Sequence, residues 1–321
     1  MSTATTCLFC NAAAITEGNA LPIHFNDRTF TWNKCKNCGL VFLWPALSDS
    51  DREKMYSKNY HDQYYFNYNE NYTQQLSLIA PYNKKSILDF GCGDAGLLDL
   101  LQKNDFETTG VEYDNELVKK LSVKFAAIKF MQEKNFWSNT STYDVIHLGD
   151  VLEHVSDPAG LIQQLKTKLN KDGLFFIEGP LERNPSVGYY FRNCTFFFRN
   201  VFNRESTRVE FPYHITYTNS NNQQLFFETI QLQKIYFKIT EAGWPYIDTI
   251  KEVRSPWLMV QYLVAKISIA VAAVIPGYGN RFIYIGKLLL NGLLLRLQLQ
   301  YFFKKSFGFS FHTFHIAGFY G

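Results

Sequence analysis

The stretch SILDFGCGDAG, Ser86–Gly96, decides the fold of this chain. Its glycines Gly91, Gly93 and Gly96 have the spacing G-x-G-x-x-G, which is a nucleotide-binding fingerprint where it joins a strand to a helix. SILDFG has the composition of a short buried strand, and GLLDLLQKND, from Gly96 onward, has that of a helix. The stretch is therefore predicted to be a strand, a glycine turn and a helix, the first unit of an α/β fold.

Strand and helix patterns continue to alternate after this turn. A helix is predicted from Pro158, with Asp157 as its N-cap, to about Asn170. Further strands are predicted at TTGVEYD (Thr108–Asp114), YDVIHLGD (Tyr143–Asp150), GLFFIEGP and QKIYFKITEAGWPYI. Such alternation predicts a parallel sheet covered on both faces, with ligands bound beyond the carboxyl ends of its strands. The polar residues expected at that rim are Asp89–Gly93, Glu112 and Gly149–His154.

Two acidic residues bear on the ligand of the glycine turn. Glu112 follows Gly93 by 19 residues, the offset of a carboxylate that binds ribose hydroxyls, and both NAD and S-adenosylmethionine (SAM) carry such a ribose. Asp89 lies beside the turn, where it would repel a pyrophosphate but pair with the ammonium group of a methionine moiety. Asp89 therefore favours SAM over NAD, whereas Glu112 suits both.

The ordered motifs ILDFGCGDAG, VEYD and GDVLEHVSDP resemble those of class I SAM-dependent methyltransferases. The resemblance implies a Rossmann-like fold with a seven-stranded sheet. It also implies that Asp89 and the glycines line the methionine end, that Glu112 binds the ribose and that Tyr113 lies on the adenine face. The cofactor-binding residues predicted in this way are Asp89, Gly91, Gly93, Glu112, Tyr113 and Gly149. The alternatives are an NAD-binding domain and a fold of this kind that binds no cofactor.

Four of the six cysteines form two C-x-x-C pairs: Cys7 with Cys10, and Cys35 with Cys38. Paired spacings of this kind predict a zinc site, and four thiolates leave no open position for catalysis. Two disulfides or a redox pair are the alternative, which the absence of an apparent export signal disfavours. We expect a small N-terminal module held together by structural Zn²⁺.

Two histidines are candidates for the catalytic base that would remove a proton from the methyl acceptor. His214 lies in FPYHITYT, which resembles a family segment where a histidine precedes a helix near the active site. His154 lies in LEHVSDP at the expected rim. The alternative for each is a structural histidine that bonds a backbone group.

The C-terminal third contains long apolar runs. Two helices are predicted, from Ser255-Pro256 to Pro276-Gly277 and from about Arg281 to Phe303, and FSFHTFHIAGFYG at the end is expected to be the final antiparallel strand. Because apolar helices need a cover, residues 256–304 are expected to meet the protein itself, a second subunit, a membrane surface or a lipid-linked substrate. A true membrane span is the least favoured because Lys266, Lys287 and Arg296 interrupt the runs.

The domain organisation expected from these patterns has five parts. They are a zinc module (1–45), a helical linker (46–80), a methyltransferase domain (81–253), an apolar helical insertion (254–305) and the final strand of the sheet (306–321). The segment CKNCGLVFLWPALSDSDREKMYSKNYHDQYY resembles the start of bacterial methyltransferases that act on nucleotide sugars, glycans or antibiotic precursors. This implies a sugar, glycan precursor or other small metabolite as acceptor, methylated at a hydroxyl or an acidic carbon.

Composition narrows the alternatives. Of the 321 residues 46% are hydrophobic, which excludes wholesale disorder, and the net charge is only +3. That charge, without basic clusters, argues against a nucleic-acid partner and against the alternative of a zinc-module ribosomal RNA methyltransferase. A non-enzymatic binding module is a further alternative, which the intact Asp89, Gly91, Gly93 and Glu112 disfavour. The expected location is the cytoplasm, peripheral to the membrane, and a homodimer is a further expectation.

Overall fold

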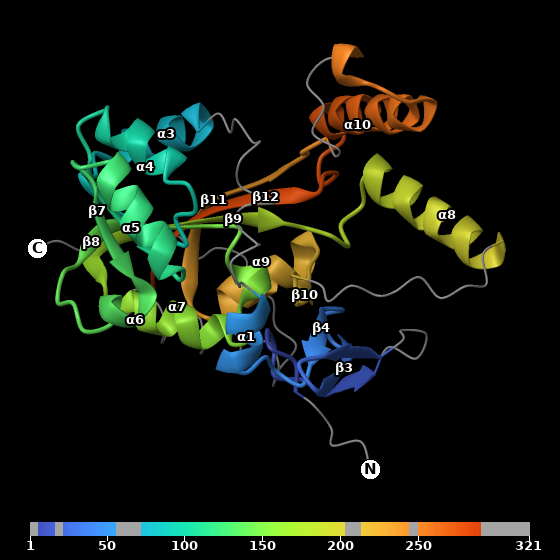
Figure 1. Cartoon of the computed structure of the whole chain (residues 1–321), viewed down its shortest axis with the longest axis horizontal. Coiled ribbons are helices and arrows are strands. Elements are labelled where there is room, and N and C mark those ends of the chain that lie inside the picture. The colour runs from blue at the N-terminus through green and yellow to red at the C-terminus, as the bar shows by residue number, and fades with distance from the viewer. Residues whose placement is uncertain (1–5, 17–21, 56–71, 203–212, 244–249, 290–321) are drawn as a thin grey trace, which may run out of the picture.

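The computed structural model describes residues 6–16, 22–55, 72–202, 213–243 and 250–289. A mixed sheet with helices on both faces forms the main domain, and a smaller β-rich module lies against it (Figure 1). Two further helices, α8 and α10, project from the sheet at the end away from α4 and α5 (Figure 1).

The main sheet has seven strands in the order β11-β12-β9-β8-β5-β6-β7. Strands β5 to β9 run parallel, and β12 is antiparallel to both of its neighbours, β9 and β11. This is the seven-stranded Rossmann-like arrangement that the sequence predicts. Its strands are β5 (Ser86–Phe90), β6 (Glu107–Glu112), β7 (Lys129–Gln132), β8 (Tyr143–Gly149), β9 (Leu169–Pro180), β11 (Leu232–Thr240) and β12 (Arg281–Leu288).

Side chains alternate between the two faces of the sheet because successive Cβ atoms point to opposite sides. On one face Leu88 and Ile146 join a cluster that includes Ile162 of α7 (Pro158–Lys166) and Phe226 of α9 (Ser220–Thr229). On the other face Ile87 and Val145 pack with residues of α4 (Gly96–Gln102). Both faces are therefore apolar, which explains why the central strands are continuous hydrophobic runs.

Helix ends in the main domain follow the predicted capping chemistry. Asp157 accepts a hydrogen bond from the Gly160 amide at 2.9 Å, and Pro158 opens α7, so the predicted start is confirmed. This helix is shorter than predicted because β9 already begins at Leu169. Asp114 caps α5 (Asn115–Lys124) in the same way, while the short α6 (Glu133–Phe136) follows β7.

The N-terminal module is an antiparallel sheet of five strands. Four come from its own sequence: β1 (Ala14–Thr16), β2 (Ile23–Phe25), β3 (Arg28–Cys35) and β4 (Val41–Trp44). The fifth, β10 (Thr216–Tyr217), comes from the main domain and pairs with β4. The module is thus completed by a segment far along the chain, beyond the boundary expected at residue 45.

The described parts of the expected linker, on either side of residues 56–71, contain helices. They are α1 (Asp49–Met55), α3 (Thr73–Ile79) and the 3₁₀ turn η1 (Ala80–Tyr82). Residues 56–71 lie outside the described residues.

The prediction of a second C-terminal helix from Arg281 is wrong for its first part. Arg281–Leu288 is strand β12, which fills the antiparallel position between β9 and β11. The helical segment therefore ends before Arg281, and β12 occupies the antiparallel position that was expected of residues 306–321. Residues 306–321 themselves lie outside the described residues. Buried on both faces, β12 has no polar alternation that would separate it from an apolar helix.

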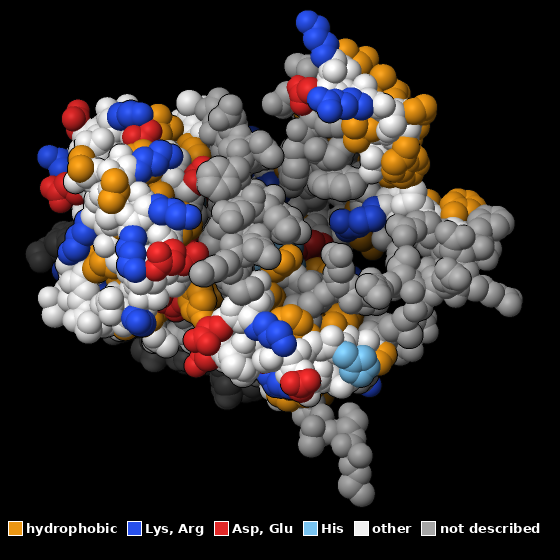
Figure 2. Space-filling model, in the orientation of Figure 1, with side chains coloured by type: hydrophobic (Ala, Val, Ile, Leu, Met, Phe, Trp, Pro, Cys, Tyr) orange, Lys and Arg blue, Asp and Glu red, His pale blue; other side chains and the backbone are white. Residues whose placement is uncertain are grey.

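Two helices flank the far end of the sheet. The first predicted helix is confirmed as α10 (Pro256–Val274), preceded by η3 (Ile250–Glu252), while α8 (Val187–Phe202) lies in the aromatic segment where no helix was expected. Among the described helices α10 is long and apolar enough to cross a membrane by length and composition, with a mean hydropathy of 1.8. Only Ala265 and Ser268 of α10 are buried, and hydrophobic side chains gather along it (Figure 2).

Candidate functional site

The glycine turn joins β5 to α4 as predicted. Gly91 has φ +82° and Gly93 has φ +50°, both in the left-handed region that favours glycine. The Gly91 amide donates to the Val111 carbonyl at 2.8 Å, which ties the turn to the end of β6. A Cβ at Gly91 would lie 2.7 Å from Cγ2 of Val151, so the turn also packs closely against the loop that follows β8.

Glu112 is buried at the end of β6 beside this turn. Its Oε2 accepts the Gly93 amide at 3.1 Å, and its Oε1 accepts the amides of Tyr113 at 2.7 Å and Asp114 at 3.4 Å. Burial raises the pKa of Glu112 to about 7, although these amide bonds oppose the shift. The structure thus brings the predicted ribose-binding carboxylate against the glycine turn.

Asp89 has a partner that the sequence analysis missed. Nδ1–H of His147, on the neighbouring strand β8, donates to Asp89 Oδ1 at 2.6 Å, and Nε2–H donates to Glu178 Oε1 on β9 at 3.2 Å. Burial alone would lower the pKa of His147, but the charge and hydrogen bond of Asp89 outweigh it and raise the pKa to about 10. The carboxyl groups of Asp89 and Glu178 thus flank the His147 ring at this edge of the sheet.

Gly149 and Tyr113 have mainly local packing roles in this geometry. A Cβ at Gly149 would lie 2.7 Å from Cε1 of His147, so the glycine makes room for that ring. Tyr113 is half-buried at the end of β6, and the Arg52 guanidinium lies 5.9 Å from its ring centroid. Gln132 donates to the Tyr113 carbonyl at 3.3 Å. The cofactor roles of Gly149 and Tyr113 stay predictions.

The two candidate histidines meet beyond the carboxyl end of β8. His154 ends the 3₁₀ turn η2 (Leu152–His154), His214 precedes β10, and their ring centroids are 4.9 Å apart. Nδ1–H of His154 donates to the Tyr213 carbonyl at 2.8 Å. Nδ1–H of His214 donates to Oε1 of Glu182 at 2.7 Å. The structure therefore brings together two residues that lie far apart in the sequence.

Opposite charge environments act on these two rings. Burial, and then the charge of His214, lower the pKa of His154 to about 4. Burial would also lower the pKa of His214, but the hydrogen bond to Glu182 and the charge of Glu153 outweigh it and raise the pKa to about 9. At neutral pH His154 is a weak proton acceptor and His214 already holds its proton, so the general-base role stays a prediction.

Glu153 is the second site residue, after His147, that the sequence analysis missed. It lies between the histidines' segments, its side chain is 5% exposed, and burial raises its pKa to about 8. Its Oε1 is buried without a hydrogen-bond partner among the described residues. Glu153 stands in the quoted motif LEHVSDP, but only the pairing of distant segments reveals that it faces His214.

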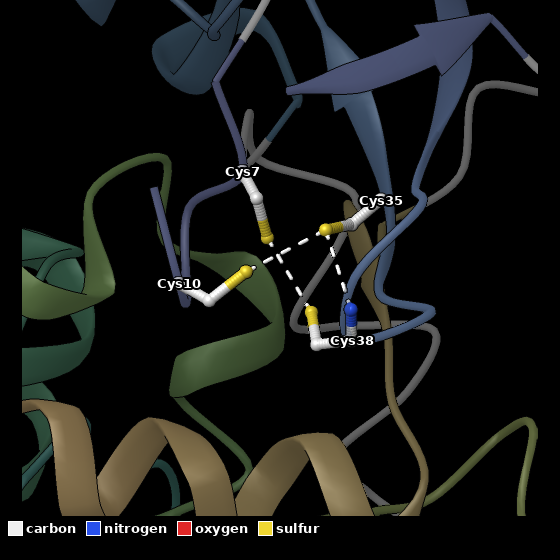
Figure 3. A group of neighbouring side chains, drawn as sticks. All are labelled: Cys7, Cys10, Cys35 and Cys38. Atoms are coloured by element: carbon white, nitrogen blue, oxygen red, sulfur yellow. Dashed lines mark hydrogen bonds between the residues drawn. The ribbon is translucent and has the colours of Figure 1, made fainter. Parts of the chain in front are cut away.

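The four predicted zinc ligands converge at one point in the N-terminal module (Figure 3). Sγ of Cys7 lies 3.6 Å from that of Cys38, and Sγ of Cys10 lies 3.5 Å from that of Cys35. A tetrahedral zinc ion with Zn–S bonds of about 2.3 Å separates its sulfurs by about 3.8 Å. The backbone amides of Phe9, Asn37 and Cys38 donate to these sulfurs, which suits thiolates. The donor set fits a closed metal site.

The module contacts the main domain next to the histidine pair. The Leu43 amide donates to the Ile215 carbonyl at 2.9 Å, and the Ile215 amide donates to the Glu153 carbonyl at 2.8 Å. Phe9, between Cys7 and Cys10, stacks on Phe226 of α9 at 4.3 Å. The cysteine cluster is therefore connected to the backbone that carries Glu153 and His214.

Comparison with known proteins agrees with this geometry. Residues 61–220 match the family described as a methyltransferase domain. A ubiquinone biosynthesis O-methyltransferase of Colwellia psychrerythraea is 34% identical over 97 residues, which cover 28% of this chain and 39% of that protein. Its counterpart from Vibrio cholerae is 31% identical over 107 residues, which cover 31% of this chain and 43% of that protein. The matched part of the chain thus spans about two fifths of the length of these relatives.

Solved structures of low identity are also similar. A SAM-dependent methyltransferase from Archaeoglobus fulgidus has 18% identity and a TM-score of 0.44, with 67% of this chain and 91% of that chain covered. A magnesium protoporphyrin IX methyltransferase from Synechocystis with bound SAH has 13% identity and a TM-score of 0.43, with 68% and 81% covered. By the family match over residues 61–220 and by its own strand order, this chain carries a Rossmann-like methyltransferase domain.

Proposed function

We propose that this protein transfers a methyl group from SAM to an oxygen atom of a small-molecule acceptor. The observation that carries the proposal is the buried Glu112 carboxylate, held by backbone amides against a glycine turn that has no room for a side chain at Gly91. The turn offers backbone and a carboxylate, which suit a ribose, and the carboxyl group of Asp89 suits an ammonium group.

SAM, when bound, supplies a methyl group activated by its sulfonium. In the proposed arrangement Glu112 accepts hydrogen bonds from the ribose hydroxyls, and Asp89 pairs with the ammonium while His147 fixes the orientation of its carboxylate. The loop after β8, which packs on Gly91 through Val151, forms the side from which the acceptor approaches. The task of these residues is to hold donor and acceptor in line.

Two classes of methyl acceptor are candidates, sugars and phenols. The resemblance of the N-terminal segment favours a sugar or glycan precursor, whereas the relatives of known name are ubiquinone biosynthesis O-methyltransferases. Both classes present a hydroxyl group. We propose a hydroxyl-bearing acceptor, with the sugar and the phenolic classes as the two to be tested.

The test has two steps that use the full chain. Calorimetry should detect binding of SAM and none of NAD, and Glu112→Ala should weaken SAM binding strongly. Incubation with labelled SAM, a panel of nucleotide sugars and a set of phenols should then transfer label to one class. Binding of NAD in preference to SAM would overturn the proposal.

We further propose that Cys7, Cys10, Cys35 and Cys38 hold a structural Zn²⁺ ion. The proposal is supported by the S···S distances near 3.6 Å and by the amide donors around the sulfurs. Zinc would stabilise the small module, whose own apolar core is limited. Elemental analysis of the purified chain should find one zinc per molecule, and a value near zero would overturn this assignment.

We propose that α10 binds a membrane surface. Its exposed hydrophobic residues include Trp257, Leu263 and Ile267, and the exposed Phe197 and Phe198 of α8 extend the apolar surface. Lys251, Arg254 and Lys266 are exposed near it and suit anionic headgroups. The alternative is that a second copy of the chain covers the apolar surface of α10. Analytical ultracentrifugation without lipid would then detect a dimer.

A further inference from the structure

The structure assigns a second metal site to the acceptor side of the methyltransferase domain. We propose that Glu153, His154 and His214 bind one divalent first-row transition-metal ion, an inference that rests on the proposed methyl transfer for its purpose but not for its geometry. Each residue offers one ligand atom, and these atoms all lie within 4.8 Å of one another. The site is distinct from the cysteine cluster, which lies in the N-terminal module.

Glu153 provides the first argument. Its side chain is 5% exposed, and within the part of the chain that the structure describes Oε1 has no hydrogen-bond partner. A buried carboxylate oxygen without a partner is costly, and such atoms in native proteins call for an explanation. This oxygen lies 3.8 Å from Nε2 of His154, too far for a hydrogen bond but suited to two ligands of one ion. A cation between them would satisfy the orphaned oxygen.

The orientation of the two imidazoles provides the second argument. In both rings Nδ1–H is held by an acceptor, the Tyr213 carbonyl for His154 and the Glu182 carboxylate for His214. In each neutral ring the lone pair is then on Nε2. Metal-binding histidines almost always donate their other ring N–H to a carbonyl or a carboxylate, which fixes the tautomer. Both histidines are thus oriented as metal ligands would be. Their partners, a backbone carbonyl and a carboxylate, are of the two types that hold metal-binding histidines.

The backbone around the site is also fixed from outside. Ile215, next to His214, is hydrogen-bonded on one side to Leu43 of the N-terminal module and on the other to Glu153. These bonds hold the segment of His214 against that of Glu153 and His154. The ligand set is therefore positioned by the fold and does not rest on a flexible loop end.

The donor set indicates the class of ion. Two imidazoles and one carboxylate suit Mn²⁺, Fe²⁺, Co²⁺ or Zn²⁺ better than Ca²⁺ or Mg²⁺, which prefer oxygen. Three protein ligands leave coordination positions open. The site follows Val151, which packs on the glycine turn, so an acceptor hydroxyl bound to the ion would lie on the side of the methyl donor.

A bound cation would give these residues a role other than that of a general base. It would lower the pKa of the acceptor hydroxyl, whose O–H bond breaks with the proton passing to water. The oxygen then forms a bond to the methyl carbon, and the carbon–sulfur bond breaks with its electron pair staying on sulfur. The oxygen, proton and methyl group are all accounted for without an oxidant or reductant.

Calorimetric titration with Mn²⁺ of the full chain carrying one Zn²⁺ per molecule tests the site, because that zinc ion occupies the four thiolates and Mn²⁺ binds thiolates weakly. We expect one Mn²⁺ per chain. Glu153→Gln and His214→Ala should lower the affinity by about 100-fold or more, and Glu182→Gln, which keeps all three ligands, by about 10- to 100-fold. His24→Ala, at an exposed histidine of the N-terminal module, should leave the affinity unchanged.

The outcomes decide the proposal in either direction. No binding of Mn²⁺ by the wild-type chain, or equal binding by the Glu153 and His214 variants, would overturn it. If His214→Ala fails to fold, as judged by its thermal transition, Glu182→Gln and Glu153→Gln decide instead. SAM titrated without added Mn²⁺ separates the two proposals: SAM binding with no Mn²⁺ binding rejects the metal site and leaves the methyltransferase function standing.

Discussion

Residue 91 must be glycine both because of its backbone angle and because the Val151 side chain lies against it. The φ angle of +82° is one that other residues rarely adopt, and a Cβ would meet Val151 at 2.7 Å. We expect Gly91→Ala to lower the free energy of unfolding by about 1–3 kcal/mol and the affinity for SAM at least tenfold, because the turn must shift. Calorimetry and urea unfolding measure the two effects.

A second glycine serves as the matched control. Gly277 also has a left-handed φ of +85°, but no atom of the described residues lies within 4 Å of a Cβ placed there. Gly277→Ala should therefore show the backbone strain alone, about 1 kcal/mol of stability, with the affinity for SAM unchanged. Equal SAM affinities of the Gly91 variant and the wild type would contradict the place of this turn in the cofactor site.

Glu112 makes SAM binding depend on pH. Burial raises its pKa to about 7 against the opposing amide bonds and with a smaller contribution from Asp114. The carboxylate that accepts ribose hydroxyls is therefore present above about pH 7 and lost below it. We expect the affinity for SAM to fall about tenfold per pH unit below that value, and calorimetry across the range measures it. Glu112→Gln should bind weakly with a flat profile; a flat wild-type profile would reject the role.

The same raised pKa has the opposite sign for folding. Because the folded state binds this proton more tightly than the unfolded chain, the contribution of Glu112 to stability is complete below about pH 4.5. It is lost as the pH rises toward 7. Cofactor binding and folding thus draw on opposite protonation states of one side chain, a tension typical of functional sites.

Residues of the site differ in how far the sequence predicts them. Asp89, Gly91, Gly93 and Glu112 are found from local spacing, because strand, turn and helix follow each other directly. The pairing of His147 with Asp89 depends on which strands are neighbours in the sheet, which local pattern does not contain. The meeting of His154 and His214 likewise depends on β10 pairing with the N-terminal module.

At the scale of elements, the errors of prediction have physical reasons. Strand β12 is central and buried on both faces, so Phe282–Ile285 is an unbroken apolar run that a helix could equally contain. Helix α8 is amphipathic, but it is rich in aromatic residues of low helix propensity, and this composition hides the helix from a reading of the sequence. By contrast α10 is predicted correctly because Ser255, Pro256 and Pro276-Gly277 mark both ends.

Helix α1 is held to the N-terminal module by the buried Asp51. Its carboxylate accepts hydrogen bonds from Asn26 and Ser48 and pairs with Arg28, and these partners outweigh burial and lower its pKa to about 2. Relative to the usual aspartate pKa of 3.8, this shift corresponds to about 2 kcal/mol of stability, present above about pH 4 and lost as the pH falls toward 2. We expect Asp51→Asn to lower the free energy of unfolding by that amount at pH 7, as measured by urea unfolding.

The neighbouring Asp49 is the control for this prediction. It pairs with Arg52 but its side chain is 85% exposed, so Asp49→Asn should change the stability by less than about 0.5 kcal/mol. The wild type and Asp51→Asn should converge as the pH falls from about 5 toward 2, because the wild-type carboxylate is then protonated. A difference that persists at low pH would show that packing, not charge, determines the effect.

Helix α10 permits a direct test of membrane binding. Leu263 and Ile267 are 50% and 53% exposed and one turn apart, so Leu263→Glu with Ile267→Glu places two charges on the apolar surface without disturbing the core. We expect the wild-type chain to float with vesicles of anionic lipid and the double variant to remain in the dense fraction. Val123→Glu, at an 86% exposed position of α5, should float like the wild type. A wild-type chain that does not float would exclude the surface contact.

At the scale of the whole molecule, the N-terminal module and the methyltransferase domain form a continuous structure. Strand β4 pairs with β10, Phe9 stacks on Phe226, and the backbone bonds from Leu43 through Ile215 to Glu153 end at the histidine pair. By contrast, the residues that would hold SAM are on β5 and β6, whose sheet partners all belong to the main domain. The module therefore supports the acceptor side more directly than the cofactor side.

This arrangement makes the loss of zinc selective in its effects. We expect Cys35→Ser to reduce the zinc content from one per chain toward zero and to lower the free energy of unfolding by several kcal/mol, because metal binding contributes directly to folding. The affinity for Mn²⁺ should fall at least tenfold because Ile215 loses its support from Leu43, while the affinity for SAM should change by less than about threefold. Cys194→Ser, at an exposed cysteine of α8, is the control and should alter none of these quantities. Equal losses of SAM and Mn²⁺ affinity in Cys35→Ser would mean that the module stabilises the domain as a whole, whereas full zinc retention would reject Cys35 as a ligand.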